Sequence, residues 1–124
     1  MFEVEIRGWF AAAHQLRMPD GQLEPLHGHN WQVRITFRGD TIDATGMLVD
    51  FTVAKPALDA VLRPLHDTNL NDHPEFSVIN PSAENVIALI AKQMQDKIGD
   101  SARIHVAEIE EAPNCWARFY PHGP

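Results

Sequence analysis

The stretch Leu26-His27-Gly28-His29-Asn30-Trp31 opens a segment in which apolar and polar residues alternate as far as Arg38. A period of two predicts a half-buried β-strand, whose successive side chains point to opposite faces. His27 and His29 stand two residues apart, so one face presents both imidazoles to a single ion. Gly28 leaves the opposite face without a side chain, and neutral imidazole is the commonest protein ligand for zinc. The segment therefore predicts a strand that carries two metal ligands.

Hydrophobic periodicity predicts the other elements. Alternating or helical spacing indicates, in order, a strand at 2–7 that can continue towards Ala13-His14, a strand at 29–38, helices at 53–65 and 83–98, and strands at 102–111 and 115–120. Thr52 and Ser82 are the predicted helix caps, and residues 17–25 read as an irregular loop. The order ββααββ predicts an α+β domain with a four-stranded antiparallel sheet and both helices on one face. We expect oligomerisation to cover the remaining sheet face or edges.

Length and composition limit the function classes. The 124 residues suit one domain, 1–124, and the hydrophobic share of 44% is that of an ordinary globular protein. Because the 17 acidic residues outnumber the 10 basic ones, general nucleic-acid binding is not expected, and a small-molecule ligand is favoured. The chain shows no apolar membrane span and no signal peptide, so we expect a cytoplasmic protein. Cys115 precedes Trp116 in an apolar strand and is expected to be buried and inert.

His14 is the natural third metal ligand. It ends the run Phe10-Ala11-Ala12-Ala13-His14, whose small residues let a neighbouring strand approach closely. Three histidines with an open fourth position describe a catalytic zinc site. The alternative is that His14 is a hydrogen-bonded core residue and that the spacing of His27 and His29 is a coincidence.

The other candidate functional residues can each be explained by an ordinary structural role as well. His66 and Asp67 are a possible acid–base pair, although such residues after a helix often serve capping and solubility. Glu108, Glu110 and Glu111 form a charge run, which is usually a solvated strand face, but Glu108 and Glu110 share one face, so one of them can turn inward as an anchor.

Several segments together resemble one family. They are Phe10 to His14, Leu26 to Asn30, Gly46 to Phe51, Leu70-Asn71-Asp72, Asn80 to Asn85, and Glu110. They occur in the order found in the 6-pyruvoyltetrahydropterin synthase family, which includes the 6-carboxytetrahydropterin synthases of queuosine biosynthesis, and they cover nearly the whole chain. The resemblance implies the tunnelling fold, in which trimers stack as a homohexamer with sites at subunit interfaces. It also implies that His14, His27 and His29 bind Zn²⁺ and that Glu110 holds the pyrimidine edge of a pterin.

The chain departs from the family pattern at two places. The usual catalytic cysteine lies four residues before the first histidine of the His-Gly-His segment, and here that residue is Leu23. Glu24 resembles a variant group in which a glutamate replaces the cysteine, in enzymes that release 6-hydroxymethyl-7,8-dihydropterin for folate synthesis; otherwise it is an exposed loop carboxylate. The family commonly has Asp-His where this chain has His66-Asp67.

The resemblance implies a zinc-dependent lyase that acts on 7,8-dihydroneopterin triphosphate with loss of triphosphate. Glu24, His66 and Asp67 are the candidate catalytic residues. The product is 6-hydroxymethyl-dihydropterin, 6-pyruvoyltetrahydropterin or 6-carboxytetrahydropterin. The alternative from another class is a pterin- or metal-binding homologue that has lost catalysis with its cysteine.

Overall fold

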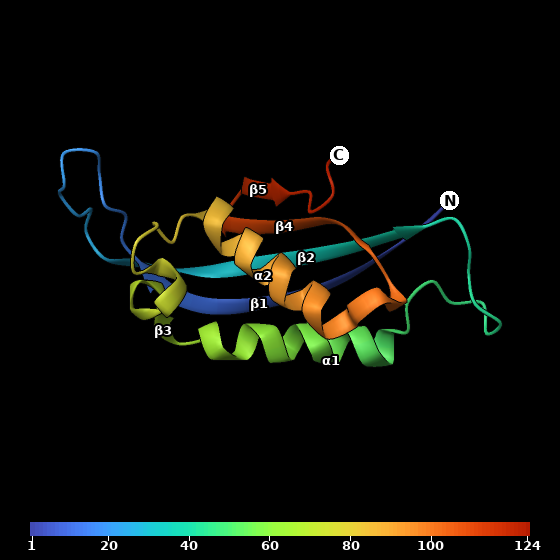
Figure 1. Ribbon diagram of the computed structural model, residues 1–124. Helices are drawn as coiled ribbons and strands as arrows, with labels where there is room; N and C mark the ends of the chain where they lie inside the picture. The colour runs from blue at the N-terminus through green and yellow to red at the C-terminus, as the bar shows by residue number, and fades with distance from the viewer.

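Two long strands form the centre of the sheet in the computed structural model, which describes residues 1–124 (Figure 1). β1 (Phe2–His14) and β2 (His27–Gly39) pair antiparallel, from Phe2 opposite Gly39 to His14 opposite His27. The pairing confirms the two strands predicted from alternation. It also places both ends of the loop at 15–26 beside the predicted metal ligands.

The sheet has five strands rather than the predicted four. Its order is β3-β1-β2-β4-β5, with β4 (Ile104–Ala112) antiparallel to β2 and β5 (Cys115–Phe119) at the edge. The additional strand, β3 (Thr68–Asn69), runs parallel to β1 opposite Ala12 and Ala13, so the sheet is mixed. Two residues are too few to show a period, and only the pairing with β1 defines this strand.

Two helices lie on one face of the sheet, as predicted (Figure 1). α1 (Phe51–Leu62) continues into a short 3₁₀ turn at Arg63–Leu65, and α2 (Ala83–Ile98) is followed by another at Gly99–Ser101. Asp50 caps α1 in place of the predicted Thr52, because its carboxylate accepts the Thr52 backbone N–H at 2.9 Å. Two more 3₁₀ turns, Leu70–Asp72 and Pro74–Phe76, occupy the predicted polar loop.

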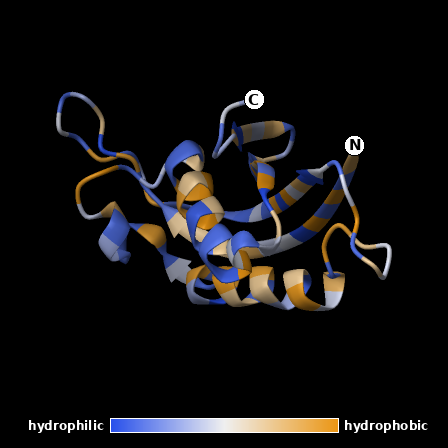
Figure 2. Ribbon diagram, turned by 45° about the vertical axis from the view of Figure 1, so that its right-hand side comes forward, coloured by the Kyte–Doolittle hydropathy of each residue, from blue (hydrophilic) through white to orange (hydrophobic).

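The hydrophobic core lies between the helices and the sheet. Bands of hydrophobic and hydrophilic residues alternate along the strands in Figure 2, as the two-residue period requires. Trp31, Val33 and Ile35 are buried on the helix face. Gly8 lets α1 approach β1, since a Cβ there would lie 2.8 Å from Leu62 Cδ1. The central strands β1 and β2 are therefore held by hydrogen bonds to their neighbouring strands and by packing against the helices.

Two further findings concern the chain outside the core. Cys115 is exposed rather than buried as expected, because it begins the edge strand β5. None of the helices has the length and apolar content needed to cross a membrane.

Candidate metal centre

The three predicted metal ligands meet where the β1–β2 ladder ends. His14 lies directly opposite His27, and His29 lies opposite Ala12 on the same face. The three side chains form a group whose ligand atoms all lie within 4.8 Å of one another. The Nε2 atoms of His14 and His27 are 3.1 Å apart. Nitrogen ligands about 2.0–2.1 Å from a tetrahedral zinc ion stand about 3.3 Å apart, so this spacing fits a shared ion.

Backbone carbonyls fix the orientation of two of the rings. His14 Nδ1 donates to Pro81 O at 2.7 Å, and His27 Nδ1 donates to Pro25 O at 2.8 Å. A neutral imidazole carries one proton, which these bonds commit to Nδ1. Both Nε2 atoms then direct lone pairs at each other, an arrangement that repels unless a cation lies between them. Nδ1–H bonds of this kind are typical of histidines that bind metals through Nε2.

His29 supplies the third nitrogen. Its Nε2 is buried and has no hydrogen-bond partner. Burial lowers the pKa of His29 below its ordinary 6.5, the nearby His14 and His27 lower it further, and the Glu111 carboxylate acts in the opposite direction. His29 is therefore neutral at neutral pH, the state in which imidazole binds a metal. A bound ion would satisfy the orphaned nitrogen.

The centre opens to solvent on one side. The exposed side-chain fraction rises from 1% at His14 to 20% at His29 and 40% at His27. Trp31 closes the opposite side, where its ring makes edge contacts with His14 and His29, and its Nε1 donates to Ala12 O at 3.1 Å. Three ligands with an open approach leave room for a substrate at the metal.

Glu24 and Glu111 flank the histidines. Glu24 Oε1 accepts the Leu16 N–H at 3.1 Å and lies 3.9 Å from His27 Nε2. Glu111 Oε1 lies 3.0 Å from His14 Nε2 and 3.9 Å from His29 Nε2. The centre therefore has a carboxylate on each side, one from the loop at 15–26 and one from β4.

Glu110, the predicted pterin anchor, is directed away from the histidines. It pairs with Gln32, which points to the face opposite the buried Trp31. Its carboxylate accepts the Asn114 N–H at 2.9 Å. A register shift between Glu110 and Ala112 leaves Glu111 as the extra residue of a β-bulge, a feature that re-aims side chains. Glu111 was not singled out from the sequence, although it follows the buried Ile109 by two residues.

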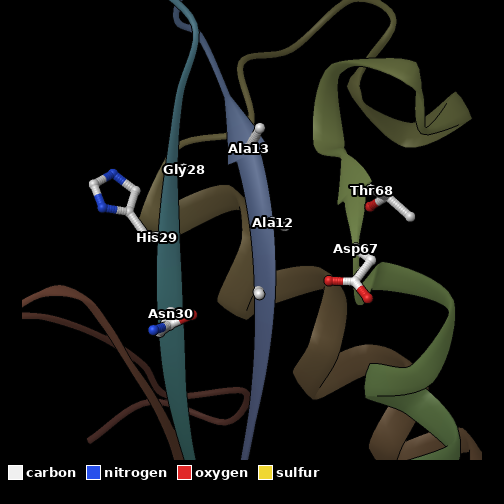
Figure 3. Close-up of a pocket in the computed structure, with 8 residues that line it drawn as sticks. Ala12, Ala13, Gly28, His29, Asn30, Asp67 and Thr68 are labelled. Carbon is white, nitrogen blue, oxygen red and sulfur yellow. The ribbon is translucent and has the colours of Figure 1, made fainter.

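His66 and Asp67 lie at the outer edge of β1. His66 Nδ1 accepts the Ala11 N–H at 3.1 Å, and Asp67 N–H donates to Ala11 O at 2.7 Å. Asp67 adopts a left-handed backbone with φ 58°, and its Oδ2 lies 3.4 Å from His66 Nε2. Figure 3 shows β1 and β2 between Asp67 and His29, around a shallow depression of about 360 Å³. Within one chain, the pair and the histidine centre are separate.

Comparison with known proteins identifies the family. The model of the 6-pyruvoyl tetrahydropterin synthase family matches residues 3–122. The chain belongs to this family. A relative in Bacillus subtilis, 6-carboxy-5,6,7,8-tetrahydropterin synthase, is 30% identical over 124 residues, which span 99% of this chain and 80% of the relative. The 6-pyruvoyl tetrahydrobiopterin synthase of Drosophila melanogaster is 30% identical over 121 residues, with 86% of this chain and 72% of the relative covered.

Solved structures of the family share the fold. The Caenorhabditis elegans 6-pyruvoyl tetrahydropterin synthase superposes with a TM-score of 0.84 at 22% identity, over 96% of this chain and 94% of that one. A Plasmodium vivax 6-pyruvoyltetrahydropterin synthase, in which a catalytic glutamate is replaced by alanine, gives 0.77 at 19% identity, over 95% and 96%. The predicted family and tunnelling fold are confirmed. The relatives are tetrahydropterin synthases by name, which confirms the predicted lyase class for the family.

Proposed function

We propose that this protein is a zinc-dependent lyase that acts on 7,8-dihydroneopterin triphosphate and releases triphosphate. One observation carries the proposal: each of three imidazoles brings a ring nitrogen within 4.8 Å of the others, and carbonyls hold the Nδ1 protons of His14 and His27. An all-nitrogen set of three ligands with an open approach suits catalytic zinc. Zinc held there would supply Lewis-acid stabilisation of charge on the hydroxyls of the substrate side chain. The names of the relatives support a pterin as the substrate.

Glu24 is the proposed proton-transfer group. Its carboxylate lies beside the solvent-exposed side of the centre, 3.9 Å from His27 Nε2, where a substrate side chain would enter. Leu23 offers no thiol at the position of the usual cysteine. The Plasmodium vivax relative is described with a catalytic glutamate, which supports the same role here. Glu24 then takes a proton from the substrate side chain, and triphosphate leaves by elimination to the 6-pyruvoyl product; for the 6-hydroxymethyl and 6-carboxy products a carbon–carbon bond also breaks and the two outer side-chain carbons leave.

A carboxylate at the end of β4 is proposed to hold the pterin ring. Two parallel hydrogen bonds from ring nitrogens to a carboxylate fix the orientation of a substrate. Glu110 is the residue predicted from the family resemblance, but its carboxylate accepts a bond from its own turn. Glu111 is the second candidate, and its carboxylate lies 3.0 Å from His14 Nε2, at the end of the site where zinc would hold the substrate side chain. The KM values of Glu110→Gln and Glu111→Gln for 7,8-dihydroneopterin triphosphate decide between the two.

The active form is proposed to be a homohexamer of two stacked trimers. β3 pairs with β1 only at Ala12 and Ala13, so most of the outer edge of β1 is free, as is the outer edge of β5. Pairing of such edges between copies removes unsatisfied backbone groups. His66 and Asp67 lie at the β1 edge, so in this assembly they serve the metal centre of a neighbouring copy. Light scattering with size-exclusion chromatography tests the assembly through its mass.

Product analysis tests the function. The zinc-loaded protein is incubated with 7,8-dihydroneopterin triphosphate, and the products are identified by mass spectrometry. We expect released triphosphate and one of the three pterin products, with little turnover by a Glu24→Gln variant. Full turnover by that variant removes Glu24 from the mechanism. An unchanged substrate that binds tightly supports the non-catalytic homologue, and an unchanged substrate that does not bind contradicts the proposed function altogether.

A further inference from the structure

Two asparagine side chains hold the chain where it leaves β1. Asn71 Oδ1 accepts the Gln15 N–H at 2.9 Å, and Asn71 Nδ2 donates to Gln15 O at 2.8 Å. Asn80 bonds Arg17 in the same way, with its Oδ1 2.8 Å from Arg17 N and its Nδ2 3.0 Å from Arg17 O. Each amide group satisfies both backbone groups of one residue, as a neighbouring strand would. We call this pair of contacts the amide clamp.

The residue between the two clamped residues holds Glu24. Leu16 N–H donates to Glu24 Oε1 at 3.1 Å, and Glu24 N–H donates to Leu16 O at 3.0 Å. In an extended chain, the backbone groups of successive residues point to opposite sides. The amide clamp therefore occupies one side of residues 15–17, and Glu24 occupies the other through both its backbone and its carboxylate.

The segment behind the clamp also holds a metal ligand. Asn80 precedes Pro81, whose carbonyl oxygen accepts His14 Nδ1–H at 2.7 Å. Asn85 Nδ2 in turn donates to Asn80 O at 2.8 Å from the first turn of α2. The segment Asn80-Pro81 before α2 thus holds His14 directly and Glu24 through Arg17 and Leu16, so the carboxylate and one metal ligand share a support.

We propose that Asn71 and Asn80 are positioning residues for the carboxylate of Glu24. This inference rests on the proposed function, in which Glu24 transfers a proton. Both polar side-chain atoms of each amide bond the backbone of one residue, which fixes the amide in place without any contact with a substrate. Their effect on the reaction passes through Leu16, and a catalytic group displaced by about 1 Å can cost about 100-fold in rate.

Kinetics of isosteric variants test the proposal. Asn80→Asp and Asn71→Asp keep the acceptor but place a carboxylate oxygen against the carbonyl of Arg17 or Gln15. We expect kcat to fall by about 10–100-fold, with KM for 7,8-dihydroneopterin triphosphate nearly unchanged. In a Glu24→Gln background the same substitutions should cause no further loss, since coupled residues are not additive. An additive loss in that background overturns the proposal, as does an unchanged kcat.

Gln95→Glu is the matched control. Gln95, in the last turn of α2, is also an amide that bridges backbone groups. Its Nε2 donates to Gly99 O and Ala102 O, and its Oε1 accepts the Ile104 N–H, all three beyond the end of the helix. This variant loses the same kind of bond far along the chain from Glu24. It should reduce stability and leave kcat unchanged. A loss of kcat as large as that of the clamp variants would show a general structural effect and overturn the proposal.

Amide hydrogen exchange tests the clamp without turnover. The amides of Leu16 and Glu24 should exchange at least about tenfold faster in Asn80→Asp and Asn71→Asp, and at the wild-type rate in Gln95→Glu. The zinc content should stay the same in all three variants. Unchanged exchange at both amides overturns the positioning of Glu24, whatever the activity. Accelerated exchange in a protein without turnover supports the clamp and contradicts the proposed function alone.

Discussion

Removal of the charge on Glu111 should weaken zinc binding, whereas the same change at its neighbour Glu110 should not. Glu111 Oε1 lies 3.0 Å from His14 Nε2 and 3.9 Å from His29 Nε2, so the carboxylate borders the position of a shared ion. Glu110 bonds Asn114 on the other side of the strand. Glu111→Gln and Glu110→Gln are therefore matched variants: they remove the same charge from adjacent residues that lie on opposite faces of β4.

The expected loss of zinc affinity follows from the distance between the carboxylate and the ion and from the exposed fraction of the Glu111 side chain. Two unit charges 4 Å apart attract by about 4 kcal/mol near a protein surface and about 1 kcal/mol in water. The Glu111 side chain is 32% exposed, which places its interaction toward the lower value. A loss of about 1.4–2.8 kcal/mol corresponds to about 10–100-fold in zinc affinity. Glu110→Gln should stay within about 0.5 kcal/mol of wild type, as surface substitutions do.

Competition with a chromogenic chelator at constant pH and salt measures both affinities. The same two variants are then compared for KM with 7,8-dihydroneopterin triphosphate, which should rise for Glu111→Gln if that residue anchors the pterin. Equal zinc affinities for the two variants would refute the placement of Glu111 beside the ion. A larger rise in KM for Glu110→Gln would identify Glu110 as the residue that binds the pterin ring.

Three further predictions concern the metal ligands and their support. Metal analysis of the purified protein should give about one zinc per chain, and His27→Ala should lose it; retained zinc contradicts the ligand set. Trp31→Phe should cost about 2–3 kcal/mol in urea unfolding, because a buried ring shrinks and Ala12 O loses its donor at 3.1 Å; a cost below about 0.5 kcal/mol contradicts this packing. Burial lowers the pKa of folded His29 below 6.5, so the unfolded chain takes up a proton first as the pH falls. Metal-free protein should therefore lose stability from pH 6.5 down to the lowered value, and an equal pH dependence in His29→Gln contradicts that origin.

Local pattern was sufficient to predict the main elements and the grouping of the three candidate metal ligands. The alternation from Trp31 to Phe37 fixes one buried face, and a slip of one residue would expose every apolar side chain on it. His27 and His29 share that face with Trp31, so the strand prediction already places them together. The antiparallel pairing with β1 then brings His14 opposite His27.

Features that depend on tertiary pairing escaped prediction. β3 exists only because Thr68 and Asn69 meet the edge of β1, which no local pattern reveals. Alternation puts Glu111 on the face of the buried Ile109, but only the pairing of β4 with β2 brings its carboxylate beside His14. Cys115 follows an apolar pattern but begins an edge strand. Asp50 and Thr52 are both good caps, and the backbone geometry selects Asp50.

The metal centre is tested most directly by diffraction from crystals of the zinc-loaded protein at the zinc absorption edge. An anomalous difference map should show one strong peak per chain, about 2.0–2.1 Å from the Nε2 atoms of His14, His27 and His29. A peak at other residues, or no peak between these three nitrogens in crystals grown with zinc, would contradict the metal centre on which the proposed reaction depends.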